Sequence, residues 1–145
     1  MPSQDPLADR LHSAAIHLLR RLAVADADSG LSPARLSALS VIVYGGPLTM
    51  TELARAERVS PSTITSTVKG LEQADLVGRR RDPSASDGRT VVVRATARGR
   101  RVLTAARRQR LRRLDVDLDR LPARDRAALE HGVAALERLL AQEPC

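Results

Sequence analysis

The segment from Ser60 to Leu76 constrains the fold more than any other part of the chain. A serine followed by proline is typical of a helix start, because proline at the first helical position has no backbone N–H to leave unpaired. Apolar residues then recur at helical spacing and predict one buried face, formed by Ile64, Val68 and Leu71. The opposite face carries short hydroxyl side chains and one lysine: Ser62, Thr63, Thr65, Ser66 and Lys69. Such a face can approach another polar surface closely, although an ordinary exposed helix rich in Ser and Thr is the alternative interpretation.

The residues on either side of this segment favour the first interpretation. Upstream, Thr49 and Glu52 match a capping box, which predicts a helix that ends near Arg58 and a tight turn before Ser60. Two short helices joined by such a turn make a helix-turn-helix, whose second helix can enter a DNA major groove. Downstream, a basic run over residues 77–82, a turn-rich stretch over 83–88 and a β-branched run over 89–94 predict a hairpin. We therefore expect a winged helix, in a fold that is mainly α with a small β wing.

Positive charge is concentrated in the middle of the chain. Residues 55–113 hold 16 basic and five acidic residues, a net charge of +11, whereas the whole chain carries +7. A concentrated basic segment is typical of a polyanion-binding protein, and a solvated basic face is the alternative. An RNA-binding surface would need aromatic side chains for base stacking, and Tyr44 is the single aromatic residue.

Long helices with apolar stripes are expected on both sides of the winged helix, over residues 7–25, 98–118 and 123–140. A small winged helix cannot bury all three stripes, so we expect them to pack on one another and on a second copy of the chain; a three-helix appendage on a monomer is the alternative. We predict one intertwined domain in which residues 1–31 and 97–145 form the helical dimerisation region and residues 32–96 the winged helix-turn-helix. The arginines of the helix over 98–118 precede its acids, against the helix dipole, so a group outside the helix should compensate them: DNA phosphates near its start, or acidic side chains of a partner helix further on; a solvated face is the alternative.

Several classes of protein are not expected. The chain has no phosphate-binding glycine loop, no nucleophile elbow and no paired carboxylates in an apolar setting, so we predict no enzyme, no catalytic residues and no cofactor. His12, His17 and His131 lack ligand spacing and predict no metal site, and Cys145 cannot form an internal disulfide. No signal peptide or membrane span is recognisable, so a cytoplasmic protein without membrane contact is expected.

The order of elements resembles the MarR family of bacterial transcription regulators across essentially the whole chain. The most specific parts of this resemblance are Leu48–Ala54, Val59–Thr65, the Leu71-Glu72 to Leu76-Val77 stretch, and Asp87-Gly88-Arg89 followed by Val91–Thr96 and Gly99. Ser66 departs from the arginine that is common at this position, and Gly70 within the recognition helix costs up to about 1 kcal/mol relative to alanine. The family's redox-sensing cysteine is absent from the first helix, so thiol sensing is not expected.

The resemblance implies a homodimer that binds double-stranded DNA at pseudo-palindromic promoter sites through recognition helices and wings. Many members are repressors that are released by small ligands, so a small-molecule effector of unknown identity is implied, in a pocket near His17, Tyr44 and the second helix. Asp87 and Arg89 match the family's Asp-x-Arg pair at the wing, where Arg89 would contact the minor groove or a phosphate. The DNA-binding residues predicted from pattern and resemblance together are Ser60, Ser62, Thr63, Thr65, Ser66, Lys69, Arg79, Arg81, Asp87 and Arg89.

We therefore predict a sequence-specific DNA-binding transcriptional regulator, a homodimeric repressor. The alternative function is a sequence-nonspecific architectural DNA-binding protein, because Ser66 and the arginine excess are compatible with binding through phosphates alone.

Overall fold

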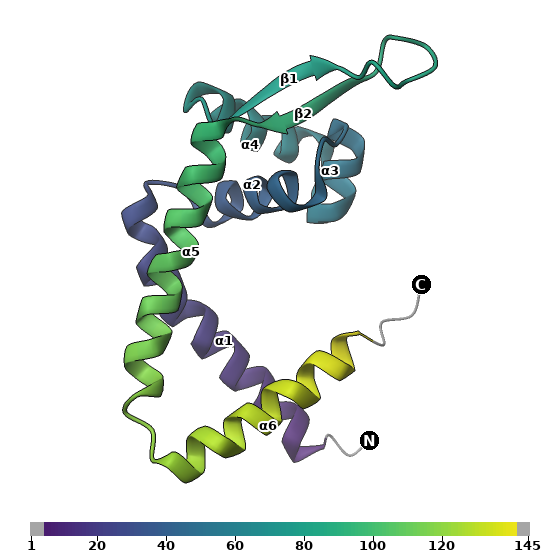
Figure 1. The fold of residues 1–145 in the computed structure, drawn as a ribbon. Coiled ribbons are helices and arrows are strands. Elements are labelled where there is room, and N and C mark those ends of the chain that lie inside the picture. Colours follow the sequence, from purple (N-terminus) through teal and green to yellow (C-terminus); the bar gives the residue numbers. More distant parts are fainter. Residues whose placement is uncertain (1–4, 142–145) are drawn as a thin grey trace. The chain divides into compact units, whose positions relative to one another are not determined.

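The computed structural model describes residues 5–141, and Cys145 lies outside this range. The chain divides into two compact parts, residues 1–110 and 111–145, and the domain boundaries expected from the sequence remain a prediction. The first part contains α1 (Pro6–Asp26), η1 (Ala27–Ser29), α2 (Pro33–Gly45), α3 (Met50–Glu57), α4 (Pro61–Gln73), β1 (Val77–Arg81) and β2 (Val91–Ala95), and α5 (Ala97–Leu118) begins in it (Figure 1). The end of α5 and α6 (Ala123–Leu140) belong to the second part.

Capping side chains start α3 and α4 where the sequence predicts them. Thr49 Oγ1 accepts the backbone N–H of Glu52 at 3.2 Å, and the Glu52 carboxylate accepts the backbone N–H of Thr49 at 2.8 Å, which completes the capping box. The bond from the Thr49 N–H, followed by one from the Thr49 hydroxyl to the same carboxylate at 3.0 Å, holds the pKa of Glu52 below its ordinary value. Ser60 caps α4 in the same way, with Pro61 at the first helical position. The predicted helix-turn-helix is therefore confirmed.

Aliphatic side chains of α2, α3, α4, the wing and α5 form the core of the first part. Leu39, Leu53, Val68 and Leu71 have no exposed surface, and Ile64 is 2% exposed, so the predicted inner face of α4 is confirmed. The core is completed by Leu36, Ala38, Ile42, Ala54, Leu76, Val77, Val93, Leu103 and Ala106. A core without aromatic side chains places these backbones close together, and it fixes α4 with its hydroxyl face outward.

The wing is a two-stranded antiparallel hairpin that projects beyond the helices of the first part (Figure 1). Its register pairs Val77 with Ala95 and Arg81 with Val91. Leu48 adds a one-residue bridge to Val93, through hydrogen bonds of 3.2 and 2.7 Å. The hairpin base is thereby joined to the start of α3, and the predicted fold class is confirmed.

The end of α4, the base of the wing and the start of α5 meet in one hydrogen-bonded junction. Thr96 donates its N–H to the carbonyl of Leu76 at 3.0 Å and its hydroxyl to the carbonyl of Asp75 at 2.8 Å. The same hydroxyl accepts the N–H of Gly99 at 2.9 Å and so caps α5. Asp75 has a left-handed φ of 57°, which turns the chain out of α4. Backbone atoms of α5 thus rest directly on the backbone that follows α4.

Large apolar side chains are exposed along α1 in the first part and along α6 in the second. Leu7, Leu19 and Val24 of α1 are 66%, 66% and 76% exposed. In α6, Leu129 and Val133 are 44% and 45% exposed. The single chain leaves these apolar stripes uncovered. None of the helices within residues 5–141 is long and apolar enough to span a bilayer.

Replacing Gly99 with alanine should destabilise the protein by about 2–3 kcal/mol, because the new Cβ would overlap the carbonyl oxygen of Leu76, and neither backbone can move without breaking the junction. Chemical unfolding of both proteins measures this difference.

Gly132→Ala in α6 is the matched control, since a Cβ at Gly132 meets no atom within 4 Å. That substitution should be neutral or stabilising by up to about 1 kcal/mol. Equal stability of the Gly99→Ala and wild-type proteins would contradict the close packing at the junction.

Candidate nucleic-acid interface and ligand pocket

The outer face of α4 exposes the side chains that the sequence assigns to DNA contact. Because Ile64, Val68 and Leu71 anchor the opposite side of the helix in the core, the hydroxyl face is held outward as one surface. The exposed side chains on it are Ser62, Thr63, Thr65, Ser66 and Lys69, with Ser60 at the N-terminal end. The structure therefore brings these six predicted residues together on one helix.

Hydrogen bonds within α4 already engage several of these hydroxyl groups. Ser60 Oγ lies 3.0 Å from Ser62 Oγ and 2.8 Å from Thr63 Oγ1, in addition to its capping bond. Thr65 Oγ1 donates to the carbonyl of Pro61 at 2.7 Å, which leaves its oxygen as an acceptor. The side chains of Ser66 and Lys69 have no hydrogen-bond partner among the described residues. These two side chains are therefore not held by hydrogen bonds within the protein.

Gly70 lies against the side chain of Arg35, a contact that the sequence does not reveal. A Cβ at this position would overlap the guanidinium group of Arg35, which lies across α4 from α2. Because the guanidinium is the far end of a flexible side chain, it can move aside for a Cβ at this position.

Carboxylates shape the tip of the wing. Asp87 accepts the backbone N–H of Arg89 and the hydroxyl of Thr90, each at 3.1 Å. These bonds, chiefly the first, hold the pKa of Asp87 below its ordinary value. Asp82 accepts the hydroxyl and N–H of Ser84 at 2.6 and 2.9 Å, which lowers its pKa for the same reason. Both aspartates stay ionised near neutral pH and act as turn caps.

The arginines that the sequence predicts at the wing have different surroundings. Arg79 donates to both carboxylate oxygens of Glu72, at 2.8 and 3.3 Å, so it ties β1 to the end of α4. Arg81 and Arg89 are exposed, and no side chain in the described part of the chain pairs with their guanidinium groups. These two side chains are therefore free to contact a phosphate, whereas Arg79 has a structural partner.

A pocket of about 570 Å³ lies between α2 and the first half of α5. Its floor is formed by Leu36, Leu103 and Ala106, which are at most 7% exposed. Its rim is polar and consists of Ser40, Tyr44, Arg107 and Arg110. Tyr44 and the second helix were expected at such a site. His17 does not line it and lies instead on the surface of α1, beside Leu11 and Ala14.

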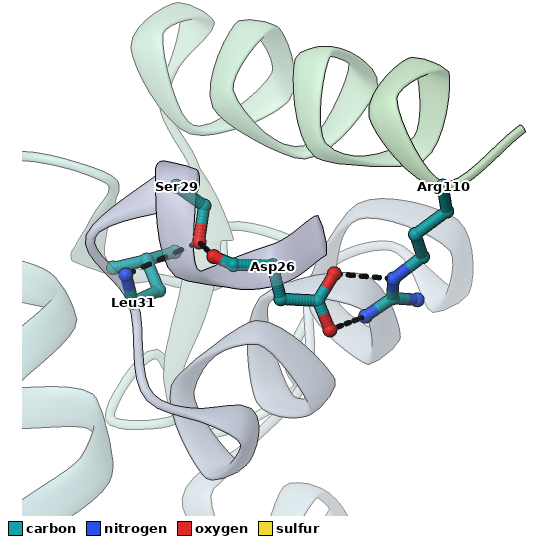
Figure 2. Close-up of polar contacts among 4 residues, drawn as sticks. All are labelled: Asp26, Ser29, Leu31 and Arg110. Atoms are coloured by element: carbon teal, nitrogen blue, oxygen red, sulfur yellow. Dashed lines mark hydrogen bonds and ion pairs between the residues drawn. The ribbon is translucent and has the colours of Figure 1, made fainter. Parts of the chain in front are cut away.

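An ion pair joins the end of α1 to the pocket wall (Figure 2). Arg110 donates through Nε and Nη2 to the two carboxylate oxygens of Asp26, at 2.5 and 2.7 Å. The hydroxyl of Ser29 donates to the Asp26 carbonyl at 2.6 Å and accepts the N–H of Leu31, which orders the turn into α2. Hydrogen bonding to Asp26 raises the pKa of Arg110 above its ordinary range.

The arginines of α5 were expected to meet an acid on another helix, and Arg110 does so through Asp26 of α1. Gln109, next to it, also donates to Asp28 at 3.1 Å. Sequence reasoning did not name Asp26, Ser40, Arg107 or Arg110 as site residues. Asp26 and Arg110 are 84 positions apart, and no local pattern indicates which acid meets which arginine. Within residues 5–141, no group of three His, Cys, Asp or Glu side chains is arranged to hold a metal ion.

On acidification, Asp87 should titrate below 3.8, the ordinary value of its pKa. Because folding lowers the pKa of Asp87, its hydrogen bonds stabilise the wing tip fully at pH values above the pKa of the unfolded chain. This stabilisation is lost as the pH falls through the lower pKa of the folded protein. Carboxyl carbon NMR shifts measure this titration.

Thr90→Val removes one of the hydrogen bonds to Asp87 and should move its pKa part of the way back toward 3.8. Asp82, which is held by Ser84, is the internal control and should not change. The same pKa for Asp87 in both proteins would refute the role of the Thr90 hydroxyl.

Comparison with known proteins agrees with this geometry. The family model described as MarR family matches residues 31–91. An uncharacterised HTH-type transcriptional regulator of Mycobacterium leprae is 32% identical over 144 residues, which cover 99% of both chains. The crystal structure of a putative transcriptional regulator from Pseudomonas aeruginosa matches with a TM-score of 0.79 and 31% identity, over 95% of each chain.

A MarR family protein of Mycobacterium tuberculosis was solved in complex with p-aminosalicylic acid. It matches with a TM-score of 0.68 and 25% identity, over 92% of this chain and 99% of that one. The family resemblance inferred from the sequence is confirmed. The chain belongs to the MarR family of DNA-binding transcriptional regulators, which are not enzymes.

Proposed function

We propose that the protein is a homodimeric repressor that binds a pseudo-palindromic promoter site and is released by a small ligand. The observation that carries this proposal is the exposed hydroxyl face of α4, which a buried aliphatic face holds outward. In a helix-turn-helix the second helix lies in the major groove, so this face is the surface that meets base edges.

The side chains on α4 suit direct reading of bases. Thr65 uses its hydroxyl proton within the helix, so its oxygen can only accept, as from an adenine or cytosine amino group. Ser66 can donate or accept, and Lys69 supplies a cation near the C-terminal end of the face. Discrimination through these groups is spread over several weak contacts rather than one bidentate arginine.

Arginines of the wing supply the contacts that do not depend on sequence. Arg81 and Arg89 lie on either side of a tip that the Asp82 and Asp87 carboxylates hold in shape. Through phosphate contacts they would set the register of the protein on DNA. Arg79, by contrast, positions β1 against α4 through Glu72, so we assign it a role in placing the wing.

Uncovered apolar stripes on α1 and α6 support the homodimer. Each helix by itself exposes several leucines or valines at helical spacing, and a second copy of the chain offers matching stripes. The pocket beside Tyr44 supports release by a ligand, because its apolar floor belongs to the core that holds α2 and α5 together. A related protein was solved with p-aminosalicylic acid, which has a benzene ring and a carboxyl group.

Selection of bound duplexes from a random pool should return a pseudo-palindrome whose half-sites lie about one helical turn, 34–36 Å, apart. Binding to this duplex should exceed binding to a scrambled control by at least about 10³-fold. Equal affinity for the two duplexes, with the same salt dependence, would instead establish an architectural DNA-binding protein.

Salt titration of DNA binding by charge variants distinguishes the phosphate contacts of the wing from the effect of charge elsewhere in the chain. Arg81→Gln and Arg89→Gln should each reduce the slope of log affinity against log salt by roughly 1, because each removes a cation that neutralises one phosphate. Arg124→Gln removes the same charge from α6 and should leave the slope unchanged. A slope that responds equally to all three substitutions would contradict a specific role of the wing.

Sedimentation equilibrium should give twice the chain mass of 15.7 kDa. Leu129→Glu or Val133→Glu places a charge in the exposed apolar stripe of α6 and should shift the protein toward the monomer. Ala127→Glu, on the opposite side of α6, is the matched control. A wild-type monomer at micromolar concentration would exclude the homodimer.

A further inference from the structure

The two arginines on the rim of the pocket differ in how they are paired. Arg107 is exposed, and its guanidinium group has no partner among the described residues. Arg110 is one helical turn further along α5 and is held by both carboxylate oxygens of Asp26. The pocket therefore has one uncommitted arginine and one that is already shared.

The pair between Arg110 and Asp26 should persist when a ligand enters. The Asp26 side chain is 10% exposed and lies at the C-terminal end of α1, where the helix dipole disfavours a negative charge. A ligand that displaced it would leave a nearly buried carboxylate without its cation, which is strongly unfavourable. Arg110, whose side chain is 40% exposed, still has Nη1 unpaired within the described chain (Figure 2). A ligand can thus reach this nitrogen while Asp26 keeps the other two.

The charge of the site follows from this arrangement. Arg107 and Arg110 contribute two positive charges, and Asp26 contributes one negative charge within hydrogen-bonding distance of Arg110. A single anionic group on the ligand therefore neutralises the site. A second one would meet no further cation on the lining and would lie near the Asp26 carboxylate.

The uncharged lining residues determine what kind of molecule can carry this anionic group. Leu36, Leu103 and Ala106 form an apolar floor, and the exposed ring of Tyr44 forms part of the rim. A volume of about 570 Å³ is enough for a small ring system. The ligand class that fits is a compact apolar body with one carboxylate.

We propose that Asp26 determines the ligand specificity of this pocket: it positions Arg110 at the rim and restricts the site to ligands with a single negative charge. Asp26 acts through Arg110 and does not itself contact the ligand. This inference rests on the proposed ligand response and specifies its chemistry.

Isothermal titration calorimetry with benzoate, isophthalate and benzamide tests the inference, because these compounds share a ring and differ in charge. The wild-type chain is compared with Asp26→Asn, which keeps the shape of the side chain and removes its charge. Arg107→Gln removes the uncommitted cation, and Arg108→Gln removes an exposed arginine that does not line the pocket. Thermal unfolding of each variant shows whether it is folded.

Wild type should bind benzoate more tightly than isophthalate or benzamide. Arg107→Gln should weaken benzoate binding by roughly tenfold or more, and Arg108→Gln should not change it. Asp26→Asn should shift the ratio of isophthalate to benzoate affinity by roughly tenfold toward isophthalate, as expected for one added positive charge in a partly exposed site. A structural role of Asp26 alone would weaken both ligands equally and leave this ratio unchanged.

An unchanged ratio in folded Asp26→Asn would overturn the proposal. If Asp26→Asn does not fold, Ser40→Lys adds a positive charge to the same rim and must shift the ratio in the same direction. Failure of wild type to bind any of the three compounds would also overturn it. Selection of DNA duplexes is independent of these titrations. A specific operator together with no benzoate binding would reject the proposed ligand site and leave the proposed DNA-binding function standing.

Discussion

The structure depends on the junction where the carbonyl groups of Asp75 and Leu76 receive the hydroxyl and N–H of Thr96. Three elements meet there without an intervening side chain, because Gly99 allows the backbone of α5 to lie against that of Leu76. A shift of α5 at this point must move the end of α4 and the base of the wing together. The packed contact thus gives a physical route by which a displacement of α5 is passed to α4 and to the wing.

Elements whose signals are local could be predicted from the sequence. Ser60, Thr49 and Thr96 start helices through bonds to residues three positions away, and Ile64, Val68 and Leu71 show their common face by spacing alone. The outward face of α4 followed directly from that spacing. The wing strands were also recognisable, because β-branched residues and a turn-rich tip occur in sequence order.

Features that depend on which distant groups meet could not be predicted in this way. Arg79 has the same chemistry as Arg81, and the carboxylate of Glu72 distinguishes them only after α4 and β1 are folded. The contact of Gly70 with Arg35 was equally hidden, since the two residues belong to different helices. The role of Asp26 was even harder to predict, because the sequence around a single acid at the end of a helix does not indicate that it is buried or which residue it pairs with.

Part of the hydroxyl face of α4 is separated from the interactions that stabilise the fold. Ser66 and Lys69 contact neither the aliphatic core nor the capping network, whereas Ser60 and Thr63 belong to that network. Changes at Ser66 and Lys69 alter this surface at little cost to folding, but changes at Ser60 and Thr63 also remove hydrogen bonds of the cap. In the proposed reading of an operator by α4, substitutions at Ser66 and Lys69 can therefore change the preferred DNA sequence without weakening the fold, whereas substitutions at Ser60 and Thr63 change both.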